Sequence, residues 1–171
     1  MLKSQSHEPS SFSYKGGELS VSGPALVSLM QGVLAKGASF RFQAKGFSMS
    51  PFIKDGDLVT IAPVSENGPG LGDVVAFTHP KHGKLVVHRV IGKRRNAYVI
   101  GGDNTPDLDG DVPSKNVLGY VTHLERDGKK ICLGLGPERY PIALLAHRRL
   151  LIPFLLLLRR FIQPFKERMT P

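Results

Sequence analysis

The sequence predicts a mainly β fold, a coiled antiparallel sheet or small barrel with one helix before it and an amphipathic helix after it. Glycine (19) and proline (13) are frequent among the 171 residues, which is typical of a chain with many turns. From Phe40 onward, short runs of apolar and β-branched residues alternate with turn signals at regular spacing. Apolar residues at helical spacing lie only before and after that region.

The first helix is expected to begin near Ser22 or Gly23, because Pro24 suits a first turn, and to end at Gly37. Its predicted apolar face consists of Leu26, Leu29, Met30, Val33 and Leu34. Strands are then expected at 40–44, 58–62, 74–77, 85–91, 97–100, 118–124 and 130–133. Asp127-Gly128 predicts a tight hairpin between the last two. Cys132 is the only cysteine, which excludes an internal disulfide, and a buried strand position is expected for it.

The positive charge of the chain is concentrated in its C-terminal part. The formal net charge is +9, and the residues from Glu138 onward include seven Lys or Arg against two Asp or Glu. A basic excess suggests an anionic partner, and its restriction to an apolar tail favours a membrane surface over nucleic acid, which is not expected as a partner. We expect three parts: a disordered leader at 1–21 without a membrane anchor, a domain at 22–137, and a tail at 138–171.

The tail predicts a helix over 140–162 that is interrupted at Pro153. Its longest apolar run, Leu150 to Leu158, covers roughly 14 Å, about half of a bilayer core. Arg148-Arg149 and Arg159-Arg160 bracket that run and project from nearly the same side of a helix, as Lys166 does. This pattern predicts an in-plane interfacial helix and peripheral membrane association, on the cytoplasmic side. The alternative is a helix that docks on the protein's own sheet.

Three segments carry candidate chemistry. Ser48 lies between a predicted strand and Pro51, where its hydroxyl could be exposed and constrained; a Ser-rich loop is the alternative. His88 lies within a predicted strand and shares a face with Val86 and Val90, as a general base or as a satisfied core histidine. The segment 101–111 contains four aspartates, and a carboxylate that orients a histidine suits it better than a calcium loop, whose spacing it lacks. No metal or cofactor is expected.

Four motifs in this order and spacing resemble the signal peptidase I superfamily, which also includes the self-cleaving SOS-repressor peptidases. They are Gly46-Phe47-Ser48-Met49 with Pro51 and Gly56-Asp57, then Gly72-Asp73-Val74-Val75, then His88-Arg89-Val90, then Gly102-Asp103-Asn104. The resemblance implies that Ser48 is the nucleophile, His88 the general base and Asp109 the orienting acid, with Asp103 bracing the loop or sharing that role.

A histidine at position 88 resembles the archaeal and endoplasmic-reticulum signal peptidases, because bacterial and SOS-type relatives usually have lysine there. Lys84 falls outside the matched position. Signal peptidases commonly have a serine two positions before the nucleophile, whereas Gly46 resembles the SOS-type members, so oxyanion binding would fall chiefly on the backbone N–H of Ser48.

The resemblance implies a serine endopeptidase that cleaves after small residues in a leader or signal peptide through an acyl-enzyme. Two alternatives stay open. One is a non-catalytic binding module that keeps the fold, and the other is a self-cleaving peptidase of the SOS type.

Overall fold

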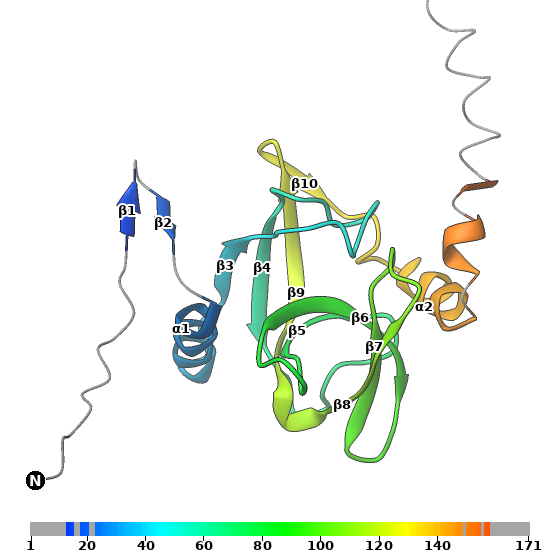
Figure 1. Ribbon diagram of the computed structural model, residues 1–171, viewed down its shortest axis with the longest axis horizontal. Coiled ribbons are helices and arrows are strands. Elements are labelled where there is room, and N and C mark those ends of the chain that lie inside the picture. Colours follow the sequence, from blue (N-terminus) through cyan, green and yellow to red (C-terminus); the bar gives the residue numbers. More distant parts are fainter. Residues whose placement is uncertain (1–12, 16–17, 21–22, 149, 155, 158–171) are drawn as a thin grey trace, which may run out of the picture.

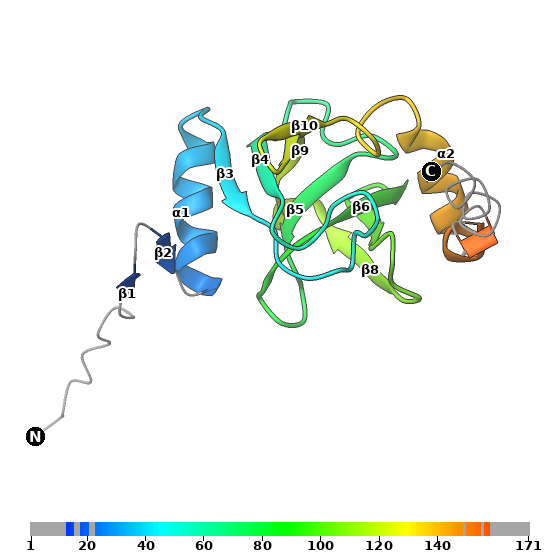
Figure 2. The same cartoon turned by 90° about the horizontal axis from the view of Figure 1, so that it is seen from above.

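The computed structural model describes residues 13–15, 18–20, 23–148, 150–154 and 156–157. An open, strongly curved antiparallel sheet of eight strands forms the body, with α1 (Gly23–Ala35) and α2 (Arg139–His147) at opposite ends (Figures 1 and 2). The strand order is β3-β4-β9-β5-β6-β7-β8, and β10 pairs with β9. The strands are β3 (Phe40–Gln43), β4 (Leu58–Pro63), β5 (Val74–Thr78), β6 (Leu85–Lys93), β7 (Ala97–Gly101), β8 (Leu108–Pro113), β9 (Val117–Arg126) and β10 (Lys129–Ile131).

The predicted mainly β fold is confirmed, and of the two predicted forms the open sheet is the one observed rather than a closed barrel. The hairpin at Asp127-Gly128 is also confirmed. Both residues have positive φ (50° and 71°), the geometry of a type I′ turn, and Lys129 pairs with Arg126 directly across it. A short 3-10 helix, η1 (Ser114–Asn116), links β8 to β9.

The core is formed by two apolar clusters on the two faces of the sheet, and β6 contributes to both. Val86 and Val90 pack in one cluster with Phe77 and Ile100, whereas Val87 packs in the other with the residues of α1. The predicted alternation of β6 is therefore confirmed, with His88 on the face of Val86 and Val90. In α1 the buried residues are Val27, Met30 and Leu34, and Leu29 is exposed, so the predicted apolar face was rotated by part of a turn.

Three strands were not predicted. β8 contains Asp109, Gly110 and Asp111, a composition that favours a turn, and it is a strand because it pairs with β7 along its length. The other two, β1 (Ser13–Lys15) and β2 (Glu18–Ser20), form a short hairpin. They fall within the segment expected to be a disordered leader, most of which lies outside the described residues. Cys132 is exposed, so the expected buried position was wrong, because β10 ends at Ile131.

The first part of the tail packs on the body. Ile142 and Leu151 are buried with Phe52 in a third apolar cluster, and Ala143 is fully enclosed. Arg139 also pairs with Asp73 at 2.9 Å. α2 ends at His147, and a second helical stretch covers 151–154, so the interruption precedes Pro153 rather than coinciding with it. Pro153 lies in the first turn of that stretch, where its missing N–H costs nothing.

The expected second half of the tail helix, including Arg159 and Arg160, lies outside the described residues. Within the part of the chain that the structure describes, every helix is too short or too polar to cross a membrane.

Candidate functional site

Ser48 lies in the loop between β3 and β4, and that loop is fixed from several sides. Gly46 has φ +92°, a conformation that side chains disfavour, and its N–H donates to the Asp55 carboxylate at 2.7 Å. The following residues turn tightly through the cis Ser50–Pro51 bond. Met49 is buried and anchors the loop in the core, while Phe47 is 68% exposed. Ser48, which is half-buried, therefore lies between the exposed Phe47 and Met49, which is anchored in the core.

The end of the loop is fixed by a pair between Asp57 and Arg126. Arg126 donates to both oxygens of the buried Asp57 carboxylate, at 2.7 and 2.8 Å, and the Lys54 N–H donates to it at 2.7 Å. Burial alone would raise the pKa of Asp57, but these hydrogen bonds and the charge of Arg126 hold it below its ordinary value. The same pair raises the pKa of Arg126.

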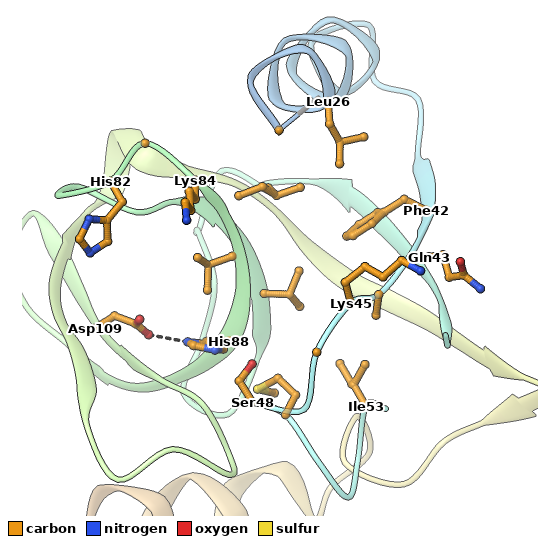
Figure 3. A pocket seen from close by; sticks show the side chains of 18 of the residues that line it. Leu26, Phe42, Gln43, Lys45, Ser48, Ile53, His82, Lys84, His88 and Asp109 are labelled. Atoms are coloured by element: carbon orange, nitrogen blue, oxygen red, sulfur yellow. Dashed lines mark hydrogen bonds and ion pairs between the residues drawn. The ribbon is translucent and has the colours of Figure 1, made fainter. Parts of the chain in front are cut away.

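His88 reaches the site from β6 and Asp109 from β8. The Nδ1 atom of His88 lies 2.6 Å from Oδ2 of Asp109, and His88 is only 8% exposed. Figure 3 shows the Ser48 hydroxyl beside the end of the His88 ring that points away from Asp109. The structure thus brings Ser48, His88 and Asp109 together from three segments, in the order that a Ser-His-Asp relay needs.

Gly102 fits between Ser48 and His88. A Cβ on Gly102 would come within 2.7 Å of the Ser48 carbonyl oxygen and 3.1 Å of His88 Nε2. Only glycine allows this close approach. Asn104 then binds the nucleophile loop, with its N–H donating to the Ser48 carbonyl at 2.7 Å and its side-chain amide to the Phe47 carbonyl at 3.2 Å.

Asp103 has a different partner from Asp109. It forms a bidentate pair with Arg89, with distances of 2.8 and 2.7 Å. Arg89 also donates to the carbonyls of Gly72 and Gly134, at 2.8 Å each. Asp103 therefore braces the loop beside the site, and the carboxylate in contact with His88 belongs to Asp109.

A cavity of about 780 Å³ opens beside these residues (Figure 3). The segment from Phe42 to Gly46 lines one wall, and the first half of β6 lines another. Among the described strands, Leu85 to His88 pair with β5 alone, because β7 pairs with β6 from Arg89 onward. Within the described part of the chain, this half of β6 therefore has an unpaired edge along the cavity, which can receive an extended chain by main-chain hydrogen bonds.

Several cavity residues were not predicted as part of the site. Lys84 lines the cavity together with Lys45 and His82, and His79 lies 3.8 Å from Asp109. His79 occurs in the β5–β6 turn without a pattern that predicts contact with Asp109, thirty positions later. Among the described residues, no three His, Cys, Asp or Glu side chains are grouped as a metal site would require.

Comparison with known proteins supports a peptidase. Residues 16–112 match the model of a protein family described as Peptidase S24-like, and this span contains Ser48, His88 and Asp109. No curated protein matches the chain.

Proposed function

Because this chain belongs to the Peptidase S24-like family, which supports serine peptidase activity, we propose that it is an endopeptidase of the signal peptidase I type with Ser48 as nucleophile. The observation that carries the proposal is the 2.6 Å contact between His88 and Asp109 next to Ser48, at the edge of a cavity large enough for a peptide. A histidine at this position favours the Ser-His-Asp type of the superfamily.

The proposed reaction follows from the proton positions. In neutral His88, the Nδ1–H group donates a hydrogen bond to the Asp109 carboxylate. Nε2 then carries no proton and can accept the proton of the Ser48 hydroxyl. The Ser48 oxygen then attacks the peptide carbonyl, and Asp109 stabilises the imidazolium that forms. His88 next gives that proton to the leaving amine, which leaves an acyl-enzyme. Water hydrolyses the acyl-enzyme by the same proton route in reverse.

The substrate is proposed to be an extended peptide with small side chains just before the cut, as in a leader or signal peptide. The unpaired edge at Leu85–His88 supports an extended conformation, because such an edge pairs with a strand along its backbone. Oxyanion binding falls chiefly to the backbone N–H of Ser48, since Gly46 provides no hydroxyl.

A self-cleaving peptidase of the SOS type is the second candidate, and Gly46 is the observation that favours it. Self-cleavage and cleavage of a separate peptide differ in how their rates depend on protein concentration. Cleavage of the chain itself is independent of dilution when it occurs within one molecule, whereas cleavage of an added peptide scales with enzyme concentration.

The experiment that tests the proposal is cleavage of a mixed peptide library, followed by mass spectrometry. Ser48→Ala and His88→Ala should each abolish cleavage, because the members of such a unit act together. The matched control is Ser65→Ala, at an exposed position in the β4–β5 loop, which should cleave as the parent does. Full turnover by folded Ser48→Ala would refute the proposed nucleophile, and a library left uncut by the parent would support the non-catalytic alternative.

We also propose that the tail, as a distinct part from residue 138 onward, holds the protein peripherally on an anionic membrane, on the cytoplasmic side. Part of it packs on the body, but a row of its apolar side chains is exposed: Tyr140, Leu144, Leu150, Phe154, Leu156 and Leu157. Basic residues lie within this stretch of the sequence, at 148–149, and shortly after it, at 159–160. Exposed apolar side chains combined with basic residues suit the interface of an anionic bilayer.

A further inference from the structure

The Asp109 carboxylate faces a second histidine. Its Oδ2 contacts His88, and its Oδ1 lies 3.8 Å from Nε2 of His79, the residue that follows β5. The side chains are nearly enclosed, with 13% of His79, 13% of Asp109 and 10% of His88 exposed. Two imidazoles therefore share one carboxylate, with one ring near each oxygen.

The hydrogen bonds of His79 define which nitrogen carries its proton. The Lys81 N–H donates to His79 Nδ1 at 3.2 Å, so Nδ1 is unprotonated in the neutral ring. The proton is then on Nε2, the nitrogen that faces Asp109. At 3.8 Å this N–H is too far for a direct hydrogen bond, and such contacts in an unliganded site commonly tighten when substrate binds.

The ring of His79 is held from several sides. Its backbone N–H donates to the Lys84 carbonyl at 2.9 Å, and the His82 ring stacks on it with centroids 4.7 Å apart. The Phe77 ring lies 6.3 Å from both His79 and His88, so one apolar side chain supports both imidazoles. The contacts of His79 thus include the ionisable side chains of Asp109 and His82, and the backbones of Lys81 and Lys84.

We propose that His79 is a positioning residue that holds Asp109 in the orientation in which Asp109 binds His88. This inference rests on the proposed function. His79 keeps its proton throughout: the proton of Ser48 passes to His88 and then to the leaving amine, and none passes through His79. Its contribution is to restrain the second carboxylate oxygen, as outer partners of functional side chains generally do.

Three substitutions of His79 test the role of its Nε2 proton. His79→Leu should lower kcat about 10- to 100-fold, with KM nearly unchanged. His79→Gln should recover most of kcat, because its amide nitrogen reaches the place of Nε2, whereas the shorter His79→Asn should not. The control is His123→Leu, at an exposed position on β9. The inference is overturned if His79→Leu keeps the parental kcat, or if the Gln and Asn variants behave alike.

A second measurement does not depend on cleavage or on the folding of a variant. Nitrogen-15 NMR of the histidine rings in the parent protein should show His79 protonated at Nε2 and not at Nδ1. A proton found on Nδ1 of the neutral His79 ring would overturn the inference even if the peptidase is active, whereas a lack of cleavage with the proton on Nε2 would refute only the proposed function.

Discussion

Arg89 and Asp103 form a bidentate ion pair whose side chains are 1% and 0% exposed. Each residue directly follows a member of the site, since Arg89 follows His88 in β6 and Asp103 follows Gly102. The pair therefore fixes the distance between the strand that carries the proposed base and the loop that touches the nucleophile segment.

Asp103→Ala should destabilise the protein by about 3 to 5 kcal/mol, because it leaves the Arg89 guanidinium buried without its counter-charge. The measurement is urea unfolding. The double variant Arg89→Met, Asp103→Leu should regain part of the loss, since no charge is then buried. A double variant no more stable than Asp103→Ala would show that the carbonyl contacts of Arg89, not the ion pair, dominate.

Asp109→Asn should instead lower kcat by a large factor while the unfolding midpoint stays close to that of the parent. The amide can present its N–H₂ group to Nδ1 of His88 and so favour the wrong tautomer, which leaves Nε2 unable to accept the Ser48 proton. Peptide turnover and urea unfolding of the same preparation separate the two effects. A purely structural role for Asp109 would lower the midpoint as much as the rate.

The contrast between these two aspartates marks the limit of sequence interpretation. The resemblance carried by the four motifs implied Ser48, His88 and, from 101–111, Asp109 with Asp103 as the alternative, whereas strand alternation alone placed His88 on the face of Val86 and Val90. Which aspartate contacts His88 depends on the pairing of β8 with β7. That strand was not predicted because the composition of β8 is polar. His79 was missed for a similar reason, since its approach to Asp109 depends on the path of the β5–β6 turn. The buried face of α2 was obscured because Phe52, its partner, is distant in sequence.

Asp57 should make stability dependent on pH in the acidic range. Its pKa is lowered in the folded state by Arg126 and the Lys54 N–H, despite its burial. The unfolded value is about 4, so this stabilisation is complete above that pH and is lost as pH falls through the lower folded value. Asp57→Asn should therefore lower the free energy of unfolding by about 2 kcal/mol at pH 7. The difference in unfolding free energy between parent and variant should become smaller below about pH 4.

Urea midpoints at pH 7, 5 and 3 measure this effect. The control is Asp127→Asn in the β9–β10 turn, where asparagine tolerates the positive φ. A stability difference for Asp57→Asn that persists unchanged at pH 3 would show that shape rather than charge is responsible.

Peptide turnover should survive removal of the amine that competes with His88 for the role of base. Lys84 lines the same cavity and is that amine. With His88 as the base, Lys84→Met should keep most of the parental kcat/KM. Loss of turnover in a folded Lys84→Met variant would assign the base to Lys84 instead.

The tail should bind anionic membranes through its exposed apolar row. Full-length protein is expected to sediment with vesicles of phosphatidylglycerol and phosphatidylcholine, less with phosphatidylcholine alone, and to be partly released by salt, because each basic residue contributes about 1 kcal/mol near an anionic surface. Leu144→Gln with Leu156→Gln should weaken sedimentation, since both side chains are exposed and would bury their apolar area in the bilayer.

The matched control for that pair is Leu29→Gln, an exposed leucine on α1 at the other end of the molecule (Figure 2), which should bind as the parent does.

Truncation gives a second, structural comparison. A chain that ends at Gly136 lacks the packing of Ile142 and Leu151 against Phe52, and it lacks the ion pair between Arg139 and Asp73. It should therefore be less stable than a chain that ends at Leu157. If the double glutamine variant and Leu29→Gln bind vesicles equally, the apolar row is not the membrane contact. If the chain ending at Leu157 binds as tightly as the full chain, the apolar row suffices without the basic residues beyond it.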